Sequence, residues 1–248
     1  MTFFHRIKNM IRWFFFPGLD LHTRNRTSLC YFWSKGERNV LDAGSGNGYF
    51  SWLAYKSGAT VVAMNCEEKQ IEKANSFFID YLGENSEKLI FEQKNLYQLN
   101  DENRVFDEII CYEVLEHIKN DSFVCEQFYR ILRPGGTLHL CCPNSSHPRH
   151  KSETLDLEEM GGHYRPGYSE EDYHKLLLPI GFHIEVIVGL GPSALYYADA
   201  ILRKIRSHTG DAFALPLFSL FYPFIKFARF NPNLPFSIYV KATKPVHQ

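Results

Sequence analysis

Short apolar runs alternate with longer amphipathic stretches along most of the chain. Apolar runs bounded by turn residues predict strands at 39–43, 60–64, 89–93, 108–112 and 136–142. Apolar side chains at helical spacing predict helices between them, at 49–55, 67–78 and 122–132, and a lead-in helix at 19–33. Strands that alternate with helices in this way predict a doubly wound α/β sheet whose strands are mainly parallel.

The turn after the first of these strands is rich in glycine. Gly44, Gly46 and Gly48 occupy alternate positions, and the helical pattern begins directly afterwards at Tyr49. Glycine lets the backbone bend sharply and approach a ligand without a Cβ in the way. The first N–H groups of the helix would face that ligand. A strand, a glycine turn and a helix therefore predict a nucleotide-type site, although a plain structural turn remains the alternative.

The spacing of the glycines indicates which ligand the turn suits. A dinucleotide-binding turn has its third glycine three positions after the second, where this chain has Tyr49. Asp42 ends the strand, two positions before the first glycine. A carboxylate there would repel a pyrophosphate but would attract an ammonium or sulfonium cation. The arrangement resembles the acid-x-Gly-x-Gly-x-Gly motif of the class I S-adenosylmethionine-dependent methyltransferases.

Two later segments carry the same resemblance. The segment FDEIICYEVLEHI at 106–118 is similar to the fourth-strand motif of small-molecule (type-11-like) methyltransferases, and LRPGGTLHL at 132–140 is similar to the helix–strand turn that follows it. The resemblance is dense from Val40 to Pro143. It implies a Rossmann-like, doubly wound, seven-stranded α/β sheet with a final antiparallel strand. An N-terminal helix and an aromatic insertion before the last strand would be added to that sheet.

The resemblance also implies the cofactor, S-adenosyl-L-methionine, and the residues that hold it. The candidate cofactor-binding residues are Asp42, Gly44, Ser45, Gly46, Gly48, Asn65, Glu67, Asn95, Leu96, Tyr112 and Glu113. The chain departs from the family at Asn65 and Asn95, where an acid is usual at the ribose and the adenine. An amide can still bond a hydroxyl, but less strongly than an ionised group can. The ribose contact is therefore assigned to Asn65, Glu67 or both.

A polar loop at 143–166 follows the fifth predicted strand, and long loops in compact domains are often binding lids. It contains a Gly-His-x-Arg segment similar to one that lies near the acceptor in related methyltransferases. His163 is thus the first candidate for a general base or an acceptor contact, and His117 is the second. The alternatives are a surface-loop histidine at 163 and, at 117, a histidine that orients the following helix.

The C-terminal part predicts a helix at 169–178 and a sixth strand at 183–188. In the resembling family a last, antiparallel strand follows, and 236–243 fits it, so 190–235 is an insertion with a helix near 194–206 and an aromatic run at 213–230. We expect one domain, divided into a helical lead-in (1–38), a donor-binding core (39–143), an acceptor-side lid with insertion (144–235) and the last strand (236–243).

The two aromatic ends of the chain leave several options open. Residues 3–16 place apolar side chains on one helical face and basic or polar ones on the other. Together with 213–230 they could cap an apolar pocket, contact an anionic membrane surface or form a dimer face. The chain has no signal-peptide pattern and no uncharged run of membrane-spanning length. A cytoplasmic protein, with or without peripheral membrane contact, is therefore expected.

Composition narrows the partners. The formal net charge is -1 among 248 residues, which is not the basic balance of a nucleic-acid binder. The six cysteines are scattered without a CxxC pair, so we predict no metal site and interpret them as small buried hydrophobes. The expected partner is a small-molecule acceptor.

The predicted function is therefore S-adenosylmethionine-dependent methylation. The acceptor would be an oxygen or carbon of a lipid-like, quinone-like or glycan-precursor molecule. A NAD(P)-type oxidoreductase is the rival enzyme, disfavoured by Tyr49 and Asp42. A catalytically silent binding protein with the same fold is the non-enzyme rival, because two expected acids are amides.

Overall fold

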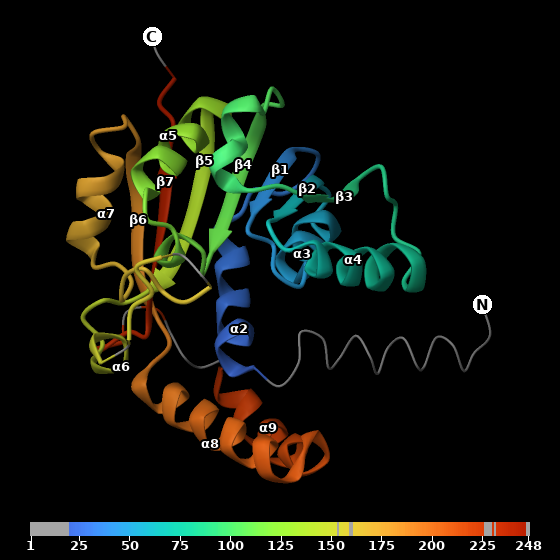
Figure 1. Ribbon diagram of the computed structural model, residues 1–248, viewed down its shortest axis with the longest axis vertical. Coiled ribbons are helices and arrows are strands. Elements are labelled where there is room, and N and C mark those ends of the chain that lie inside the picture. The colour runs from blue at the N-terminus through green and yellow to red at the C-terminus, as the bar shows by residue number, and fades with distance from the viewer. Residues whose placement is uncertain (1–19, 153, 159–160, 226–229, 231, 247–248) are drawn as a thin grey trace. The chain divides into compact units, whose positions relative to one another are not determined.

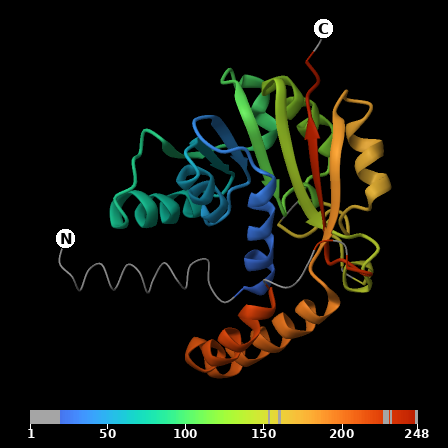
Figure 2. The same cartoon turned by 180° about the vertical axis from the view of Figure 1, so that it is seen from behind.

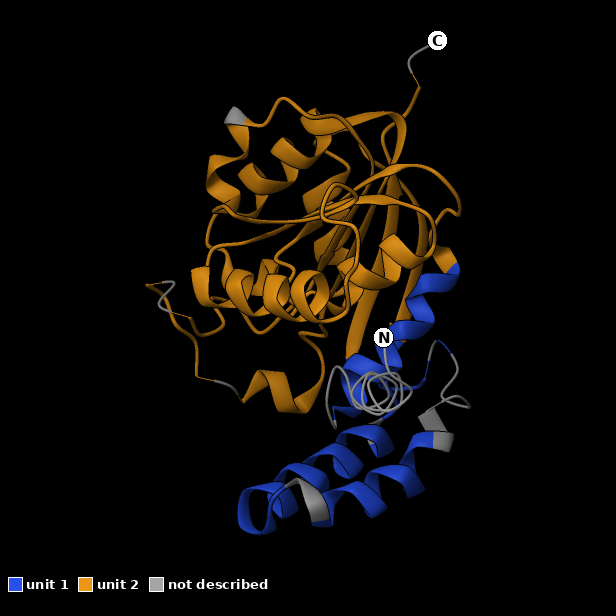
Figure 3. Cartoon of the chain, turned by 90° about the vertical axis from the view of Figure 1, so that its right-hand side faces the viewer, with its two compact units in different colours: residues 1–31, 190–236 blue, residues 32–189, 237–248 orange. Residues whose placement is uncertain are grey.

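The computed structural model describes residues 20–152, 154–158, 161–225, 230 and 232–246 (Figure 1). The helix predicted at 3–16 lies outside these residues, as does part of the aromatic run at 213–230. The chain divides into two compact units (Figure 3), one formed by 1–31 with 190–236 and the other by 32–189 with 237–248. The domain division predicted from the sequence stays a prediction.

The larger unit is built on a seven-stranded sheet with the order β3-β2-β1-β4-β5-β7-β6. Its strands are β1 (Asn39–Ala43), β2 (Thr60–Asn65), β3 (Leu89–Gln93), β4 (Phe106–Tyr112), β5 (Leu132–Pro143), β6 (His183–Leu190) and β7 (Ser237–Thr243). The neighbours from β3 to β5 are parallel, and β7 is antiparallel to β5. The predicted doubly wound sheet with its antiparallel last strand is confirmed.

Helices lie on both faces of this sheet (Figures 1 and 2). The α-helices of the larger unit are α3 (Tyr49–Lys56), α4 (Glu68–Ala74), α5 (Asp121–Ile131), α6 (Pro148–Lys151) and α7 (Glu170–Leu177). Shorter turns are the π-helix η2 (Asn75–Tyr81) and the 3-10 helices η3 (Leu96–Asp101) and η4 (Leu115–His117). The helix predicted at 67–78 is thus an α-helix that widens into a π-helix, a difference that periodicity alone does not indicate.

The core of the larger unit lies on both sides of the central strands. Side chains such as Leu41, Ile109 and Leu140 are fully buried. Parallel strands covered by helices on both faces are apolar on both faces, which explains why these runs are continuous rather than alternating. Four of the six cysteines are buried here as well, at 111, 125, 141 and 142.

β5 begins earlier than the strand predicted at 136–142. Phe106 pairs with Leu132 and Glu108 pairs with Thr137, so residues 133–136 bulge opposite a single residue of β4. Gly135 has a φ of 76° there, and its N–H donates to the carbonyl of Lys244 at 2.7 Å. The Pro-Gly-Gly turn that was expected to precede the strand therefore lies inside it, because the end of β7 continues the pairing.

The smaller unit is helical. It contains α2 (Leu21–Arg26), most of the 3-10 helix η1 (Thr27–Phe32), α8 (Ser193–Thr209) and α9 (Asp211–Ile225). The helix predicted at 19–33 is thus split in two. Leu21, Leu202 and Phe218 pack together in the core of the smaller unit. Within the part of the chain that the structure describes, no helix combines the length and the apolar character needed to cross a membrane.

A buried polar network holds β4 to its neighbours. Glu108 accepts hydrogen bonds from Arg38 Nε at 2.5 Å and from the Ser34 N–H at 2.7 Å, and lies 3.4 Å from His139 Nε2. Tyr239 contacts the other nitrogen of His139 at 2.7 Å. Burial raises the pKa of Glu108, but His139, Arg38 and the Ser34 N–H outweigh it and hold the pKa at about 2. Burial lowers the pKa of His139, so Arg38 is the cation of this network at neutral pH.

We predict that Glu108→Gln destabilises the larger unit by about 3–5 kcal/mol at pH 7, because it leaves the Arg38 guanidinium buried without its counterion. Urea unfolding measures the change. The folded pKa lies below the unfolded value of about 4.3, so the wild-type advantage exists above that pH and fades as the pH falls toward 2. Glu171→Gln is the control, since Glu171 and its partner Lys175 are 75% and 68% exposed and should matter by less than about 0.5 kcal/mol. Equal effects of the two substitutions would contradict the prediction.

Candidate active site

The strand register brings several loops to one edge of the sheet. Ala43 at the end of β1 pairs with Met64 of β2, and Asn65 of β2 pairs with Gln93 of β3. A pocket of about 640 Å³ opens at this edge, a volume typical of small-molecule and cofactor sites. It is lined by Gly44, Gly46, Met64, Asn65, Cys66, Glu67, Lys94, Asn95, Leu96, Tyr97, Glu113, Val114, His117, Ile118, Glu158 and Gly161.

The glycine turn has the backbone that its sequence requires. Gly44, Gly46 and Gly48 all have positive φ, at 81°, 52° and 78°. A Cβ on Gly44 would lie 2.3 Å from Val114, and one on Gly48 would lie 2.8 Å from Phe91, whereas one on Gly46 would meet nothing within 4 Å. The first and third glycines are therefore fixed by packing. Gly46 leaves open space at the pocket.

The turn is also tied to the neighbouring strand. The N–H groups of Gly44 and Ser45 both donate to the carbonyl of Met64, at 2.9 and 2.8 Å. These two donors are therefore used within the protein. Ser45 is buried, and neither it nor Gly48 lines the pocket; Gly48 instead precedes α3 as its N-cap residue. Their predicted roles in cofactor binding stay predictions.

Asp42 and Tyr112 lie in the sheet next to the pocket lining rather than in it. Asp42 is 3% exposed and accepts a hydrogen bond from Ser51 Oγ at 2.5 Å. Burial raises the pKa of Asp42 to about 6, although the bond from Ser51 opposes the shift. The Tyr112 hydroxyl accepts a hydrogen bond from Trp33 Nε1 at 3.0 Å, and its ring packs edge-on against Phe50 at 5.1 Å. Asp42 thus lies beside the pocket without lining it, and from there its ionised carboxylate can attract a cationic ligand.

The two amides that replace the expected acids both line the pocket. Asn65 Oδ1 accepts from the Glu67 N–H at 2.8 Å, and Asn95 Oδ1 accepts from the Tyr97 N–H at 2.9 Å. Each side chain thus closes a local turn with its oxygen, as Asn commonly does. The amide nitrogen is then the group that each can offer to a ligand. Leu96 and Glu67 line the pocket beside them.

Glu113 has an unusual backbone where β4 ends. Its φ is 55°, and among the described residues it is the non-glycine residue with a positive value. Such a conformation costs about 1–3 kcal/mol and is concentrated at functional sites. The N–H of Glu113 donates to Cys141 of β5 at 2.7 Å, which holds the bend in place. The bend carries Glu113 and Val114 into the pocket lining.

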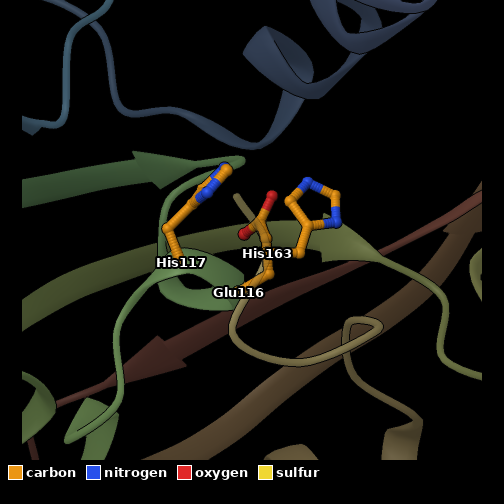
Figure 4. A group of neighbouring side chains, drawn as sticks. All are labelled: Glu116, His117 and His163. Atoms are coloured by element: carbon orange, nitrogen blue, oxygen red, sulfur yellow. The ribbon is translucent and has the colours of Figure 1, made fainter. Parts of the chain in front are cut away.

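The two candidate histidines lie next to each other, although they are far apart in the sequence (Figure 4). The rings of His117 and His163 meet edge-to-face with their centroids 4.7 Å apart. His117 Nδ1 lies 2.8 Å from the Gly162 carbonyl, which can only accept, so Nδ1 donates in this hydrogen bond. His117 lines the pocket, and His163 is held beside it.

A buried acid that the sequence analysis missed completes this group. Glu116 is fully buried, and one ligand atom from each of Glu116, His117 and His163 lies within 4.8 Å of the others. Such a group could hold a metal ion. The prediction that the protein has no metal site stays a prediction, and these three side chains are the group at which metal binding would be tested. The signal for Glu116 was its position beside His117 in the 106–118 motif.

Other lining residues also escaped the sequence analysis. Lys94 and Tyr97 flank the predicted adenine residues, Val114 and Ile118 lie near the second histidine, and Glu158 comes from the loop at 143–166. Lys94 is paired with Glu102 at 3.2 Å, and the Tyr97 hydroxyl accepts from the Asn120 N–H at 3.0 Å. Lys94, Tyr97, Val114 and Ile118 could have been found because they lie close in the sequence to predicted site residues. Nothing in the sequence indicated Glu158.

Comparison with known proteins agrees with this geometry. A family model described as a methyltransferase domain matches residues 20–186. The mitochondrial ubiquinone biosynthesis O-methyltransferase of Rattus norvegicus is 24% identical over 195 residues, covering 70% of this chain and 56% of that protein. The ubiquinone biosynthesis O-methyltransferase of Xanthomonas oryzae is 30% identical over 138 residues, covering 52% of this chain and 54% of that protein. The chain thus spans about half the length of the curated relatives it matches.

Solved structures show the same fold. A methyltransferase structure from Bacillus halodurans has a TM-score of 0.60 at 19% identity, covering 90% of this chain and 99% of its own. An S-adenosylmethionine-dependent methyltransferase structure from Listeria monocytogenes has a TM-score of 0.58 at 16% identity, covering 89% and 97%. The methyltransferase resemblance predicted from the sequence is confirmed. Because the matched family model covers more than half of the chain, the chain belongs to the methyltransferase domain family.

Proposed function

We propose that this chain moves a methyl group from S-adenosylmethionine to an oxygen or carbon atom of a small molecule with an apolar part. A quinone-like acceptor is favoured over a lipid-like or glycan-precursor one, because the curated relatives are named for ubiquinone biosynthesis. One observation carries the proposal: the glycine turn, the two amides and His117 all open on the same pocket.

The donor side is assigned to the strand ends. Gly44 and Gly46 would lie along the methionyl part, since Gly46 leaves space where a Cβ would otherwise stand. Asn65 and Glu67 would bind the ribose, and Asn95 with Leu96 would bind the adenine. When bound, S-adenosylmethionine supplies an electrophilic methyl group on a sulfonium. The residues of the pocket hold the reacting groups in line and exclude water, which can contribute about 7–11 kcal/mol.

The acceptor side is assigned to His163 and His117. If the acceptor is a hydroxyl, a histidine that takes its proton contributes roughly 10²–10⁴-fold. Because His117 Nδ1 is bonded to the Gly162 carbonyl, Nε2 is the His117 atom that would take the proton, and His163 is the neighbouring candidate. If the acceptor is carbon or an anionic oxygen, no dedicated base is needed. The oxidoreductase alternative is set aside by the family match, while a silent binding protein is tested by turnover.

The smaller unit carries the proposed peripheral membrane contact. Tyr197 on α8 is 64% exposed, and Phe213 and Leu220 on α9 are 70% and 62% exposed. α8 also carries Arg203 and Lys204, and basic residues beside exposed apolar ones suit an anionic bilayer surface. An apolar acceptor dissolved in that bilayer would then be close to the enzyme.

The pH dependence of donor binding tests Asp42. An ionised carboxylate attracts the donor, so we expect affinity for S-adenosylmethionine to fall as the pH drops below about 6, by up to tenfold per pH unit. Asp42→Asn should bind more weakly and show no such slope. Calorimetry measures both, with S-adenosylhomocysteine as a comparison that lacks the sulfonium charge. If Asp42→Asn binds S-adenosylmethionine as tightly as the wild type does, Asp42 does not contribute to donor binding.

The same substitution has an opposite effect on stability. The pKa of Asp42 is raised from 3.8 to about 6 by folding, so ionisation opposes the folded state at neutral pH. Asp42→Asn should therefore raise the free energy of unfolding at pH 8 by up to about 3 kcal/mol, and the gain should vanish below pH 4. A gain in stability with a loss of donor affinity would distinguish a binding role from damage to the fold.

Labelled donor identifies the acceptor. The protein is incubated with methyl-labelled S-adenosylmethionine and a metabolite and lipid extract, and the labelled product is identified by mass spectrometry. We expect label on a phenolic or quinol-type ring. For a hydroxyl acceptor, His117→Asn and His163→Asn are compared, and loss of the histidine that takes the proton should lower the turnover number 10²–10⁴-fold with donor affinity unchanged. The absence of any labelled product would leave a binding protein as the better description.

Vesicle flotation tests the membrane contact. The full chain should float with vesicles containing phosphatidylglycerol and should stay behind with pure phosphatidylcholine vesicles, because the proposed surface is basic as well as apolar. The double variant Phe213→Ser with Leu220→Ser should lose most of this binding. The matched control is Leu178→Ser, an apolar residue that is 49% exposed in the other unit. If the wild-type chain floats with neither kind of vesicle, the proposed membrane contact is wrong.

A further inference from the structure

His163 lies on a segment without helix or strand. The described residues 154–158 and 161–168 form turns and irregular backbone between α6 and α7. A side chain on such a segment is located only by the bonds that the segment makes to a rigid neighbour. The bonds that hold residues 161–168 therefore decide where His163 stands.

Backbone bonds attach the segment to η4. The N–H groups of Tyr164 and Arg165 both donate to the carbonyl of Glu116, at 2.8 and 3.1 Å. His117 Nδ1 donates to the Gly162 carbonyl on the other side of His163. These bonds flank the histidine on both sides, two of them between backbone groups and one from the His117 side chain.

Arg165 adds a fork of side-chain bonds at the same place. Its Nη1 bonds Asp121, and its Nη2 donates to the carbonyls of Ile118 and Lys119 at 2.8 and 2.9 Å. These acceptors are the residues that lead from η4 into α5. A planar guanidinium can reach all of them at once, which a lysine ammonium on a flexible stem cannot do as well.

Tyr168 adds a second side-chain bond to Asp121, the residue that Arg165 also contacts. Its hydroxyl donates to the same Asp121 Oδ2 at 2.6 Å and lies 3.1 Å from the Leu115 carbonyl. Burial raises the pKa of Tyr168, so the hydroxyl keeps the proton that it donates. The ring is 2% exposed and stacks on Tyr173 at 5.1 Å. Asp121 is thus held by a cation and by a buried donor, at the first turn of α5 where a carboxylate is favoured.

The far end of the segment is fixed separately. The Tyr168 N–H donates to the Pro143 carbonyl at 2.8 Å, and a Cβ on Gly167 would lie 2.0 Å from that oxygen. The segment is therefore joined to the end of β5 whether or not Arg165 is present. The side chain of Arg165 is itself 25% exposed. Its loss should release residues 161–165 without unfolding the sheet.

We propose that Arg165, with Asp121 and Tyr168, is a positioning residue that holds His163 against His117 at the acceptor side of the pocket. The catalytic consequence of this positioning rests on the proposed function, because it assumes that His163 contacts the acceptor. Its geometry can be measured without any acceptor. Arg165 touches neither the glycine turn nor the residues assigned to the donor, so it acts on one side of the pocket only.

The experiment compares Arg165→Met and Arg165→Lys with the wild type, each with ¹³C-labelled histidine rings. In the wild type we expect a nuclear Overhauser contact between the rings of His117 and His163. Arg165→Met should abolish it and shift the His163 ring signals, and Arg165→Lys should restore it only in part. Affinity for S-adenosylmethionine, measured by calorimetry, should stay within about twofold of wild type. The control Arg133→Met removes an exposed arginine paired with Asp107 and should change none of these readouts.

A second variant keeps the test decisive if Arg165→Met folds poorly. Tyr168→Phe keeps the buried ring and removes only the hydroxyl that contacts Asp121 and the Leu115 carbonyl, so it should weaken the contact between the histidine rings without loss of S-adenosylmethionine binding. An unchanged ring contact in both variants would overturn the proposal. Loss of donor binding together with the ring contact would overturn it as well, since the residue would then support the whole pocket. Failure of the proposed function would appear elsewhere, as absence of labelled product with the wild type.

Discussion

The parallel register of β1 between β2 and β4 is the constraint on which the site depends. Asp42 pairs with Ala63 on one side and with Ile110 on the other. This pairing brings the glycine turn, the end of β2 and the bend at Glu113 to one edge. A slip of one residue would exchange the side chains packed on the two buried faces of β1 and would turn the Asp42 carboxylate away from Ser51, so packing fixes the register. The same burial that stabilises the sheet therefore aligns the residues that line the pocket.

Several features of the site work against stability. Glu113 is held at a positive φ, and Asp42 is ionised at neutral pH only against the cost of its burial. Conflicts of this kind between local preference and overall fold are typical of functional positions. The buried pair of Arg38 and Glu108, by contrast, satisfies both charges within hydrogen bonds and lines no part of the pocket. The larger unit thus separates the ion pair that stabilises it from the strained or charged residues that lie at the pocket or beside it.

Apolar runs were enough to predict the strands β1 to β4, because parallel strands buried on both faces give continuous apolar runs, whereas β7 was predicted from the family resemblance. The glycine turn was predictable for a similar reason, since positive φ and close packing on Val114 restrict the residue type. The bulge at residues 133–136 and the burial of Glu116 were not predictable. Both depend on contacts with distant segments, the end of β7 in one case and the loop around His163 in the other. Sequence patterns record local preference and periodicity, but they do not record which loops meet.

This distinction explains why the cofactor was easier to predict than the acceptor. The donor side is built from strand ends and the first turns after them, whose positions follow from the register. The acceptor side joins η4 to residues 161–168, a segment held by the Arg165 fork and by backbone bonds to Glu116. Relatives can change such a loop at little cost to the sheet, because its bonds are local and its far end is anchored on β5. In the proposed assignment, the strand ends of the rigid sheet therefore bind the methyl donor, and the loop that a few side chains hold in place selects the acceptor.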